Sequence, residues 1–187
     1  GMIGVELPMA LVRQNIGNIK VTETGGRDFA KSIMTTDSRP KDIAISVDID
    51  GSKVTMGGAA KGIGMVHPNM ATMLCFVATD ASVEQGYLRE ALKAAVDVSF
   101  NMIDVDGDQS TNDTVLVLAN GASGGRTIEA GTEAASAFQD GLTYVCTTLA
   151  KELVRGKIKN QRTLLQRNHI EPPRQSLAQM KAVARQV

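Results

Sequence analysis

The pair Ala71-Thr72 combines a small residue with a hydroxyl nucleophile at the start of an apolar run. The threonine hydroxyl can attack the carbonyl carbon of the preceding residue, which moves the acyl group from nitrogen to oxygen, and hydrolysis of this ester releases a new N-terminus. The freed α-amine has a pKa close to neutrality and can act as base for its own hydroxyl. The turn at Pro68-Asn69 and the cation of Lys61 would support this reaction.

A structural interpretation of the same pair is also available, because threonine is common at the start of a strand. The residues from Met73 to Ala78 form an apolar run of the length and composition of a buried strand. Composition and spacing alone therefore leave open whether Thr72 is a nucleophile or an ordinary strand residue.

The acidic segment 104–113 has a spacing of carboxylates that suggests a calcium loop. The EF-hand template requires Gly at its sixth position and Glu at its twelfth. Counted from Asp104, these positions hold Gln109 and Val115, so the segment is not an EF-hand. It is interpreted as a turn-rich segment that orders its own backbone, and support of an active site is the alternative.

Other residue types that could do chemistry show no metal-binding spacing. The two histidines, His67 and His169, are far apart in the sequence, and no histidine and cysteine are spaced as metal ligands. Cys75 and Cys146 lie in apolar patterns, which predicts buried small hydrophobes. The glycine-rich segment NGASGGR, residues 120–126, lacks the pattern of a phosphate-binding loop and is interpreted as a connection.

The motif KGIGMVHPNMATML, followed by SFNMIDVDGDQSTNDT, resembles the ornithine acetyltransferase family over residues 1–155. Members of this family are made as one precursor that cleaves itself at an Ala-Thr bond. The resemblance implies that cleavage between Ala71 and Thr72 separates an α-chain part, residues 1–71, from a β-chain part, residues 72–155. Thr72 would then carry acetyl from N-acetylornithine to glutamate.

The resemblance also implies roles for three further residues. Lys61 resembles the substrate-binding lysine of the Lys-Gly-x-Gly-Met loop, and Thr35 of IMTTD resembles a threonine that contacts substrate. Gly1 resembles the glycine of the oxyanion hole, whose threonine would precede this chain. Thr72 would itself contact substrate as well as act as nucleophile.

Cofactors, partners and location follow from the same resemblance. No metal or organic cofactor is expected, because an ester intermediate holds the acetyl group; acetyl-CoA is an alternative donor in bifunctional members. Full-length members are expected to form α2β2 hetero-tetramers, with no nucleic-acid or membrane partner and a cytoplasmic location. The alternatives are an N-terminal-nucleophile amidohydrolase or aminopeptidase, and an inactive truncated fragment.

The elements that must position these residues follow from hydrophobic periodicity. The order is a helix starting near Gly26, a hairpin turning at Asp50-Gly51, a strand from Met73 to Ala78, a helix capped by Ser82, a strand in TNDTVLVLA and a long helix capped by Thr132. Alternating Ile43, Ile45, Val47 and Ile49 would face the core. This order predicts an α+β (layered α/β) domain with two long helices packed on a mixed sheet. The resemblance implies a fold similar to that of self-cleaving ornithine acetyltransferases and DmpA-like proteins.

Composition changes abruptly near the C-terminal end of the 187 residues. Residues 1–155 hold 13 Lys+Arg and 19 Asp+Glu, whereas residues 156–187 hold 7 Lys+Arg and Glu171 alone. Residues 156–187 show no family resemblance, and family members are about twice as long as this chain, so an N-terminal part and the true C-terminal part are expected to be missing. A frameshift or misplaced gene end, a solvated basic tail and a nucleic-acid-binding tail are the three interpretations of this divergent segment. Aromatic residues amount to only 3%, which argues against binding nucleic acid by base stacking.

Overall fold

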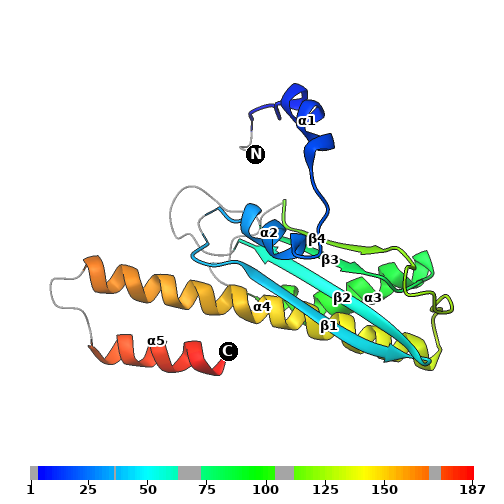
Figure 1. Cartoon of the computed structure of the whole chain (residues 1–187). Helices are drawn as coiled ribbons and strands as arrows, with labels where there is room; N and C mark the ends of the chain where they lie inside the picture. Colours follow the sequence, from blue (N-terminus) through cyan, green and yellow to red (C-terminus); the bar gives the residue numbers. More distant parts are fainter. Residues whose placement is uncertain (1–3, 36, 63–72, 104–111, 169–173) are drawn as a thin grey trace.

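The computed structural model describes residues 4–35, 37–62, 73–103, 112–168 and 174–187 (Figure 1). In these residues the chain forms a mixed α and β fold around one sheet, as predicted. The elements in chain order are α1 (Met9–Asn15), η1 (Ile16–Asn18), α2 (Gly25–Ser32), β1 (Lys41–Ile49), β2 (Ser52–Lys61), β3 (Leu74–Thr79), α3 (Gln85–Asp97), η2 (Phe100–Met102), β4 (Thr114–Ala119), α4 (Glu133–Asn168) and α5 (Arg174–Gln186).

The sheet has the strand order β1-β2-β3-β4, and its directions are mixed. β1 pairs antiparallel with β2 and β2 antiparallel with β3, whereas β3 and β4 are parallel and are joined through α3. The turn between β1 and β2 is formed by Asp50 and Gly51, both with positive φ, as a two-residue hairpin turn requires. The predicted hairpin and mixed sheet are thus confirmed.

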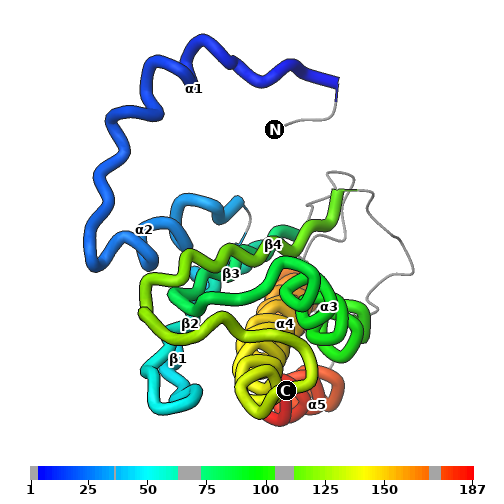
Figure 2. The backbone as a smooth tube through the Cα atoms, turned by 90° about the vertical axis from the view of Figure 1, so that its right-hand side faces the viewer, coloured from blue at the N-terminus to red at the C-terminus, as the bar shows by residue number. Residues whose placement is uncertain are grey.

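The two faces of the sheet are covered differently. α3 and α4 lie against one face, and α2 lies against the other (Figure 2). α4 packs tightly against the sheet at Gly58, where a Cβ atom would lie 2.9 Å from side-chain atoms of both Val145 and Leu149. The largest fully buried side chains are on the α4 side, and they include Met56, Phe138, Leu142, Leu149 and Leu153. The apolar stripe predicted for α4 is therefore the centre of the core, and Ile43, Ile45 and Val47 pack against it.

Of the two predicted N-cap residues, Ser82 was wrong and Thr132 was confirmed. The cap of α3 is Glu84, whose carboxylate accepts hydrogen bonds from the backbone N–H groups of Gly86 and Tyr87. Ser82 instead hydrogen-bonds Thr127, and Val83 still pairs with the extended chain at Ile128, so the helix cannot begin before that pairing ends. The Thr132 hydroxyl caps α4 by accepting from the N–H of Ala135 at 3.0 Å.

Residues 156–168 continue α4 without a break, and α5 packs beside its second half (Figures 1 and 2). Leu177 and Ala184 are the residues of α5 that this contact buries. The basic side chains Lys159, Arg167, Arg174, Lys181 and Arg185 are exposed. The segment is therefore helical where the structure describes it, with the apolar side of α5 on α4 and these five charges in solvent, whereas Lys157 is buried and Arg162 is half-buried.

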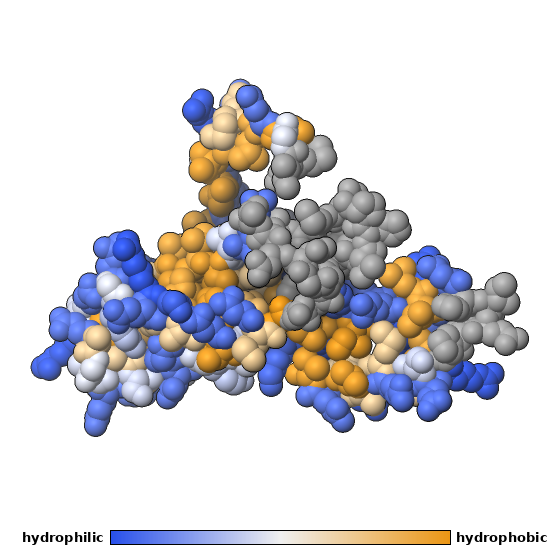
Figure 3. Space-filling model, turned by 180° about the vertical axis from the view of Figure 1, so that it is seen from behind, coloured by the Kyte–Doolittle hydropathy of each residue, from blue (hydrophilic) through white to orange (hydrophobic). Residues whose placement is uncertain are grey.

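The N-terminal residues 4–21 stand away from the sheet and present apolar side chains to solvent (Figures 1 and 3). Neither α1 nor η1 contains a buried residue. On the body of the protein, Leu116 and Leu118 of β4 are also exposed, the latter at 67%. None of the helices described by the structure combines the length and apolar character needed to span a membrane.

Candidate active site

The candidate site residues are brought together at one end of the sheet. β1 starts and β2 stops at this end, and β3 and β4 both start there; the strand register pairs Lys41 with Ala60, Lys61 with Leu74, and Leu74 with Thr114. We call it the site end. The opposite end carries the Asp50-Gly51 turn, Thr79 and the starts of α3 and α4, and we call it the hairpin end.

Lys61 is the last residue of β2 and is only 8% exposed. Among the residues that the structure describes, no carboxylate forms an ion pair with its ammonium group. Burying an ammonium group without a partner of opposite charge is costly. A carboxylate brought by a small ligand would compensate this charge, so the position suits the binding of an anionic group next to the start of β3.

Thr35 lies in the connection between α2 and β1, and its side chain is exposed. The chain runs from Thr35 directly into β1, which starts at Lys41 of the site end. The structure therefore places the connection that carries Thr35 at the same end of the sheet as Lys61.

A buried ion pair holds the connection that carries Thr35. Lys41 Nζ donates to Asp37 Oδ1, and the side chains are 4% and 7% exposed respectively. Lys41 also packs against α4, since a Cβ atom at Gly156 would lie 3.5 Å from its Cε. Asp37 Oδ2 is buried and has no hydrogen-bond partner among the described residues. The sequence analysis did not single out this pair, because an Asp and a Lys four residues apart in a loop carry no recognisable signal.

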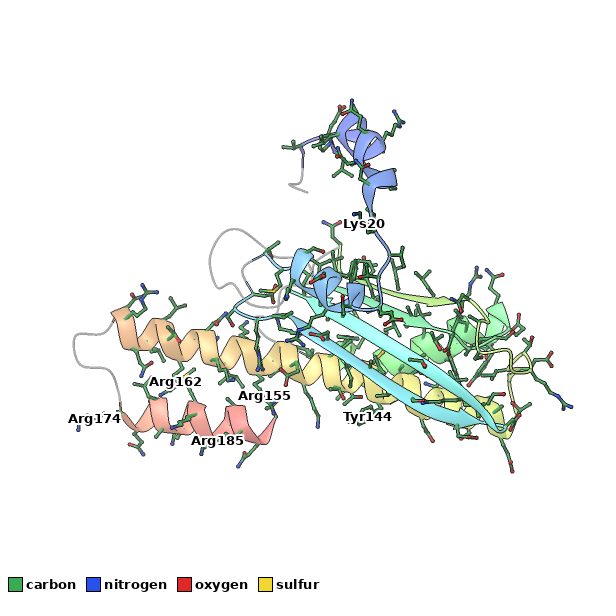
Figure 4. All side chains as sticks on the ribbon, viewed as in Figure 1. Lys20, Tyr144, Arg155, Arg162, Arg174 and Arg185 are labelled. Atoms are coloured by element: carbon green, nitrogen blue, oxygen red, sulfur yellow. The ribbon has the colours of Figure 1, made fainter. Side chains whose placement is uncertain are left out.

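A second set of contacts holds the segment between α2 and β1 against α4 and α5. Arg39 pairs with Glu152 of α4, and Glu152 also accepts a hydrogen bond from Arg155 at 2.6 Å. Arg155 lies on the side of α4 that faces α5 and donates to the backbone oxygen of Ala184 (Figure 4). These contacts position the entry into β1 against the middle of α4.

Met73, the residue just before β3, is held by contacts on both sides of its backbone. Its N–H donates to Asp113 Oδ1 at 2.8 Å, and its carbonyl oxygen accepts from the N–H of Thr114 at 3.0 Å. Sequence reasoning missed Asp113 as an individual residue, although it singled out the segment 104–113. Asp113 does not order its own loop by this bond; it binds a backbone group 40 residues away.

Several predicted residues lie outside the described part of the chain. These are Gly1, Ala71 and Thr72 of the predicted site, both histidines, and residues 104–111. Thr72 is nevertheless the covalent neighbour of Met73. Its assignment as nucleophile stays a prediction, as do those of the other site residues.

The cysteines are buried, as predicted, and their burial makes them unsuited to nucleophilic chemistry. Both are free thiols with no exposed surface. Burial raises the pKa of the Cys75 thiol far above its ordinary value, with a smaller contribution from Cys146, and burial raises the pKa of Cys146 to about 11. Since the thiolate is the reactive form, neither cysteine competes as a nucleophile. The described residues also contain no group of three or more His, Cys, Asp or Glu side chains that could hold a metal ion.

Comparison with known proteins decides the family. A sequence model of the ArgJ family matches residues 1–157. This chain belongs to the ArgJ family. The matched part of the chain includes the whole sheet, α2, α3 and the first two thirds of α4, whereas α5 lies beyond it.

Individual ArgJ relatives match over the same part of the chain. The arginine biosynthesis bifunctional protein ArgJ of Dehalococcoides mccartyi strain CBDB1 is 51% identical over 155 residues, which cover 83% of this chain and 38% of that protein. The protein of the same name from Symbiobacterium thermophilum is 54% identical over 157 residues, covering 83% of this chain and 39% of that protein. This chain thus spans about two fifths of the length of the curated relatives it matches.

A solved structure of an ArgJ protein can also be aligned with this chain. The crystal structure of the arginine biosynthesis bifunctional protein ArgJ from Bacillus halodurans is 40% identical in sequence. The alignment covers 44% of this chain and 38% of that chain, with a TM-score of 0.42.

Proposed function

We propose that this chain is part of an acetyltransferase of arginine biosynthesis, which moves acetyl from N-acetylornithine to glutamate through an ester on Thr72. The relatives are named arginine biosynthesis bifunctional proteins. The observation in the structure that carries the proposal is the pairing of Lys61 with Leu74 across β2 and β3. It places a buried cation beside the strand start that directly follows Thr72 and Met73 in the chain.

The proposed maturation step is an acyl shift followed by hydrolysis. The Thr72 hydroxyl oxygen attacks the carbonyl carbon of Ala71, an ester bond forms, and the peptide bond between the two residues breaks. The hydroxyl proton is transferred to the amine that leaves. Water then cleaves the ester, which leaves a carboxylate on Ala71 and a free hydroxyl and amine on Thr72.

The proposed transfer reaction uses the same hydroxyl twice. Thr72, with its own α-amine as base, attacks the acetyl group of N-acetylornithine, and ornithine leaves. Glutamate then accepts the acetyl group from the ester. Lys61 would bind a substrate carboxylate, Thr35 would hydrogen-bond the substrate, and the N–H of Gly1 would contribute to the oxyanion hole. Because the ester stores the acetyl group, we propose no cofactor, and acetyl-CoA would serve as a second donor.

The resemblance also motivates a proposed assembly and location for the full-length protein. Two copies each of an α and a β chain would form a hetero-tetramer in the cytoplasm, with small-molecule substrates only. Size-exclusion chromatography with light scattering of a full-length relative tests this assembly, and a monomeric αβ species would contradict it.

Intact-mass spectrometry of the purified chain tests the proposal directly. We expect two fragments that meet between Ala71 and Thr72, and Thr72→Ala should leave only the uncut chain of 19.8 kDa. Thr163→Ala, which changes an exposed threonine of α4, is the control that should cut like the parent. Cutting that persists in Thr72→Ala would move the nucleophile elsewhere.

The acceptor is tested separately. Acetyl-labelled N-acetylornithine is supplied with and without glutamate, and the labelled products are identified. Label in N-acetylglutamate supports the transferase. Release as acetate only, at a rate that glutamate does not change, would favour an amidohydrolase, and no turnover would favour an inactive fragment.

A further inference from the structure

The hydrogen bond between Met73 and Asp113 lies one peptide group away from Thr72. Met73 N–H donates to Asp113 Oδ1 at 2.8 Å, and Met73 itself is 9% exposed. On its other side, the carbonyl oxygen of Met73 accepts from Thr114 N–H at 3.0 Å, at the point where β4 begins to pair with β3. Residues 113 and 114 therefore hold both backbone polar groups of Met73.

Peptide planarity carries this constraint back to residue 72. The six atoms from one Cα to the next lie close to one plane, because the C–N bond has partial double-bond character. An acceptor that fixes the N–H of Met73 therefore also restricts where the Cα atom of residue 72 lies. The side-chain hydroxyl of a threonine is only two bonds from that Cα atom.

We propose that Asp113 is a positioning residue, which holds the peptide group of Met73 so that the Thr72 hydroxyl reaches the carbonyl carbon of Ala71. This inference rests on the proposed self-cleavage. In the proposed step the ester forms and the peptide bond breaks at Ala71 and Thr72, and the hydroxyl proton goes to the leaving amine; we assign Asp113 no part in these bond changes. The proposed effect of Asp113 is transmitted through the Met73 amide.

The constraint matters more once the chain is cut. Before cleavage, residue 72 is held by a peptide bond on each side, but afterwards only its bond to Met73 remains. New chain ends fray unless they are tied down. Asp113 and the start of β4 would then be the contacts that keep the new N-terminal threonine at the site end.

The hairpin end offers a matched control. Asp80 Oδ1 accepts from the backbone N–H of Thr55 at 2.7 Å, so a carboxylate holds a strand N–H there as Asp113 does at the site end. Removing either carboxylate leaves one backbone N–H without its protein acceptor. Only the removal of Asp113 affects the residue that follows the proposed nucleophile.

The test compares Asp113→Ala, Asp113→Asn and Asp80→Ala with the parent chain. Formation of the two fragments is followed by intact mass, with and without hydroxylamine, which attacks the ester formed by the acyl shift. Thermal unfolding of each uncut precursor is measured in parallel. We expect Asp113→Ala to slow cutting about 10- to 100-fold, as the displacement of a reacting group does. Asp80→Ala should cut at the parent rate even where it lowers the unfolding temperature equally.

The conservative variant separates positioning from charge. The side-chain oxygen of Asn can accept the same hydrogen bond, so Asp113→Asn should cut within about threefold of the parent. Equal rates for Asp113→Ala and Asp80→Ala would overturn the inference, as would an Asp113→Asn rate as low as that of Asp113→Ala. A parent chain that stays uncut would instead overturn the proposed self-cleavage, and with it this role of Asp113.

Discussion

The two ends of the sheet use charged side chains for different purposes. At the hairpin end, carboxylates accept from backbone groups: Asp80 binds the N–H of Thr55, and Asp48 binds the N–H of Gly51 within the turn. At the site end, Asp113 likewise accepts from the N–H of Met73, but lysine side chains are also buried there, as for Lys41 and Lys61. Charged groups at the hairpin end thus complete hydrogen bonds of the fold, whereas the site end also buries two ammonium groups, and burying a charge is costly to stability.

This difference has a physical meaning for the proposed activity. No ion pair compensates the buried cation of Lys61 among the residues that the structure describes, and a buried charge without a partner lowers stability, which favours a binding role for this lysine over a structural one. The hairpin end also has an exception, because Ser123 Oγ is buried without a partner among the described residues. A neutral hydroxyl costs far less to bury than a charge, so the site end still carries the larger cost of burying polar groups.

The largest expected effect is on stability at the site end. Lys41→Met removes the partner of Asp37 and leaves a buried carboxylate unpaired, which should lower the free energy of unfolding by about 3–5 kcal/mol. Urea unfolding followed by circular dichroism measures this loss. Lys53→Met, in the exposed part of β2 near the hairpin end, should change it by less than about 0.5 kcal/mol.

A double variant separates the pair from its surroundings. Asp37→Asn combined with Lys41→Met removes both charges, and it should recover most of the stability that Lys41→Met loses. If the double variant is as unstable as Lys41→Met, the loss comes from packing against α4 and not from an unpaired carboxylate.

The second expected effect sets binding against stability. Lys61→Met removes the buried ammonium, so stability should stay equal or rise, while acetyl transfer should weaken by about 10- to 100-fold through the loss of a charge-assisted hydrogen bond. The Michaelis constants for N-acetylornithine and glutamate are compared with those of Lys53→Met. A destabilised but fully active Lys61→Met would show that Lys61 is structural, and would remove the functional contrast between the two ends.

A third comparison lies midway between the ends. A Cβ atom at Gly58 would meet Val145 and Leu149 at 2.9 Å, whereas the nearest atom for Gly57 is 3.8 Å away. Gly58→Ala should therefore destabilise the protein by about 1–3 kcal/mol through overpacking against α4. Gly57→Ala is the control, and calorimetry should show little change. Equal effects of the two substitutions would mean that α4 adjusts, and that it does not fix the distance between helix and sheet.

Much of the fold could be predicted from the sequence because its signals are local. The Asp50-Gly51 turn, the alternation in β1 and the apolar stripe of α4 each arise from neighbouring residues and their periodicity. The start of α3 was misplaced for the opposite reason. Ser82 is a good cap by type, but the pairing of Val83 with Ile128, 45 residues away in sequence, keeps the chain extended until Glu84.

The site could be predicted only in part, for the same reason. Lys61 and Thr35 were named through a family motif, and the structure shows the strand end and the connection on which they lie. Asp113 and Met73 are 40 residues apart, so no local pattern connects them. The Asp37–Lys41 pair is close in sequence but owes its burial to packing against α4. Contacts of this kind depend on the assembled fold.

The smallest expected effect concerns acid sensitivity at the hairpin end. Hydrogen bonds from the N–H groups of Gly86 and then Tyr87 hold the pKa of Glu84 below the ordinary glutamate value of 4.5. A carboxyl whose pKa is lowered by folding stabilises the protein above its unfolded pKa, and this contribution is lost as the pH falls through the folded pKa.

Glu84→Gln should therefore lower the unfolding temperature slightly at pH 7, and the difference from the parent should shrink once the pH falls below the unfolded-state value. Ser82→Ala, at the wrongly predicted cap, should show a difference that does not vary with pH. Thermal unfolding from pH 7 to pH 3 checks both variants. If Glu84→Gln differs from the parent equally at every pH, the charge of the Glu84 carboxylate does not contribute to the cap. The ionised carboxylates that hold backbone N–H groups at the hairpin end would then stabilise the sheet but not the start of α3.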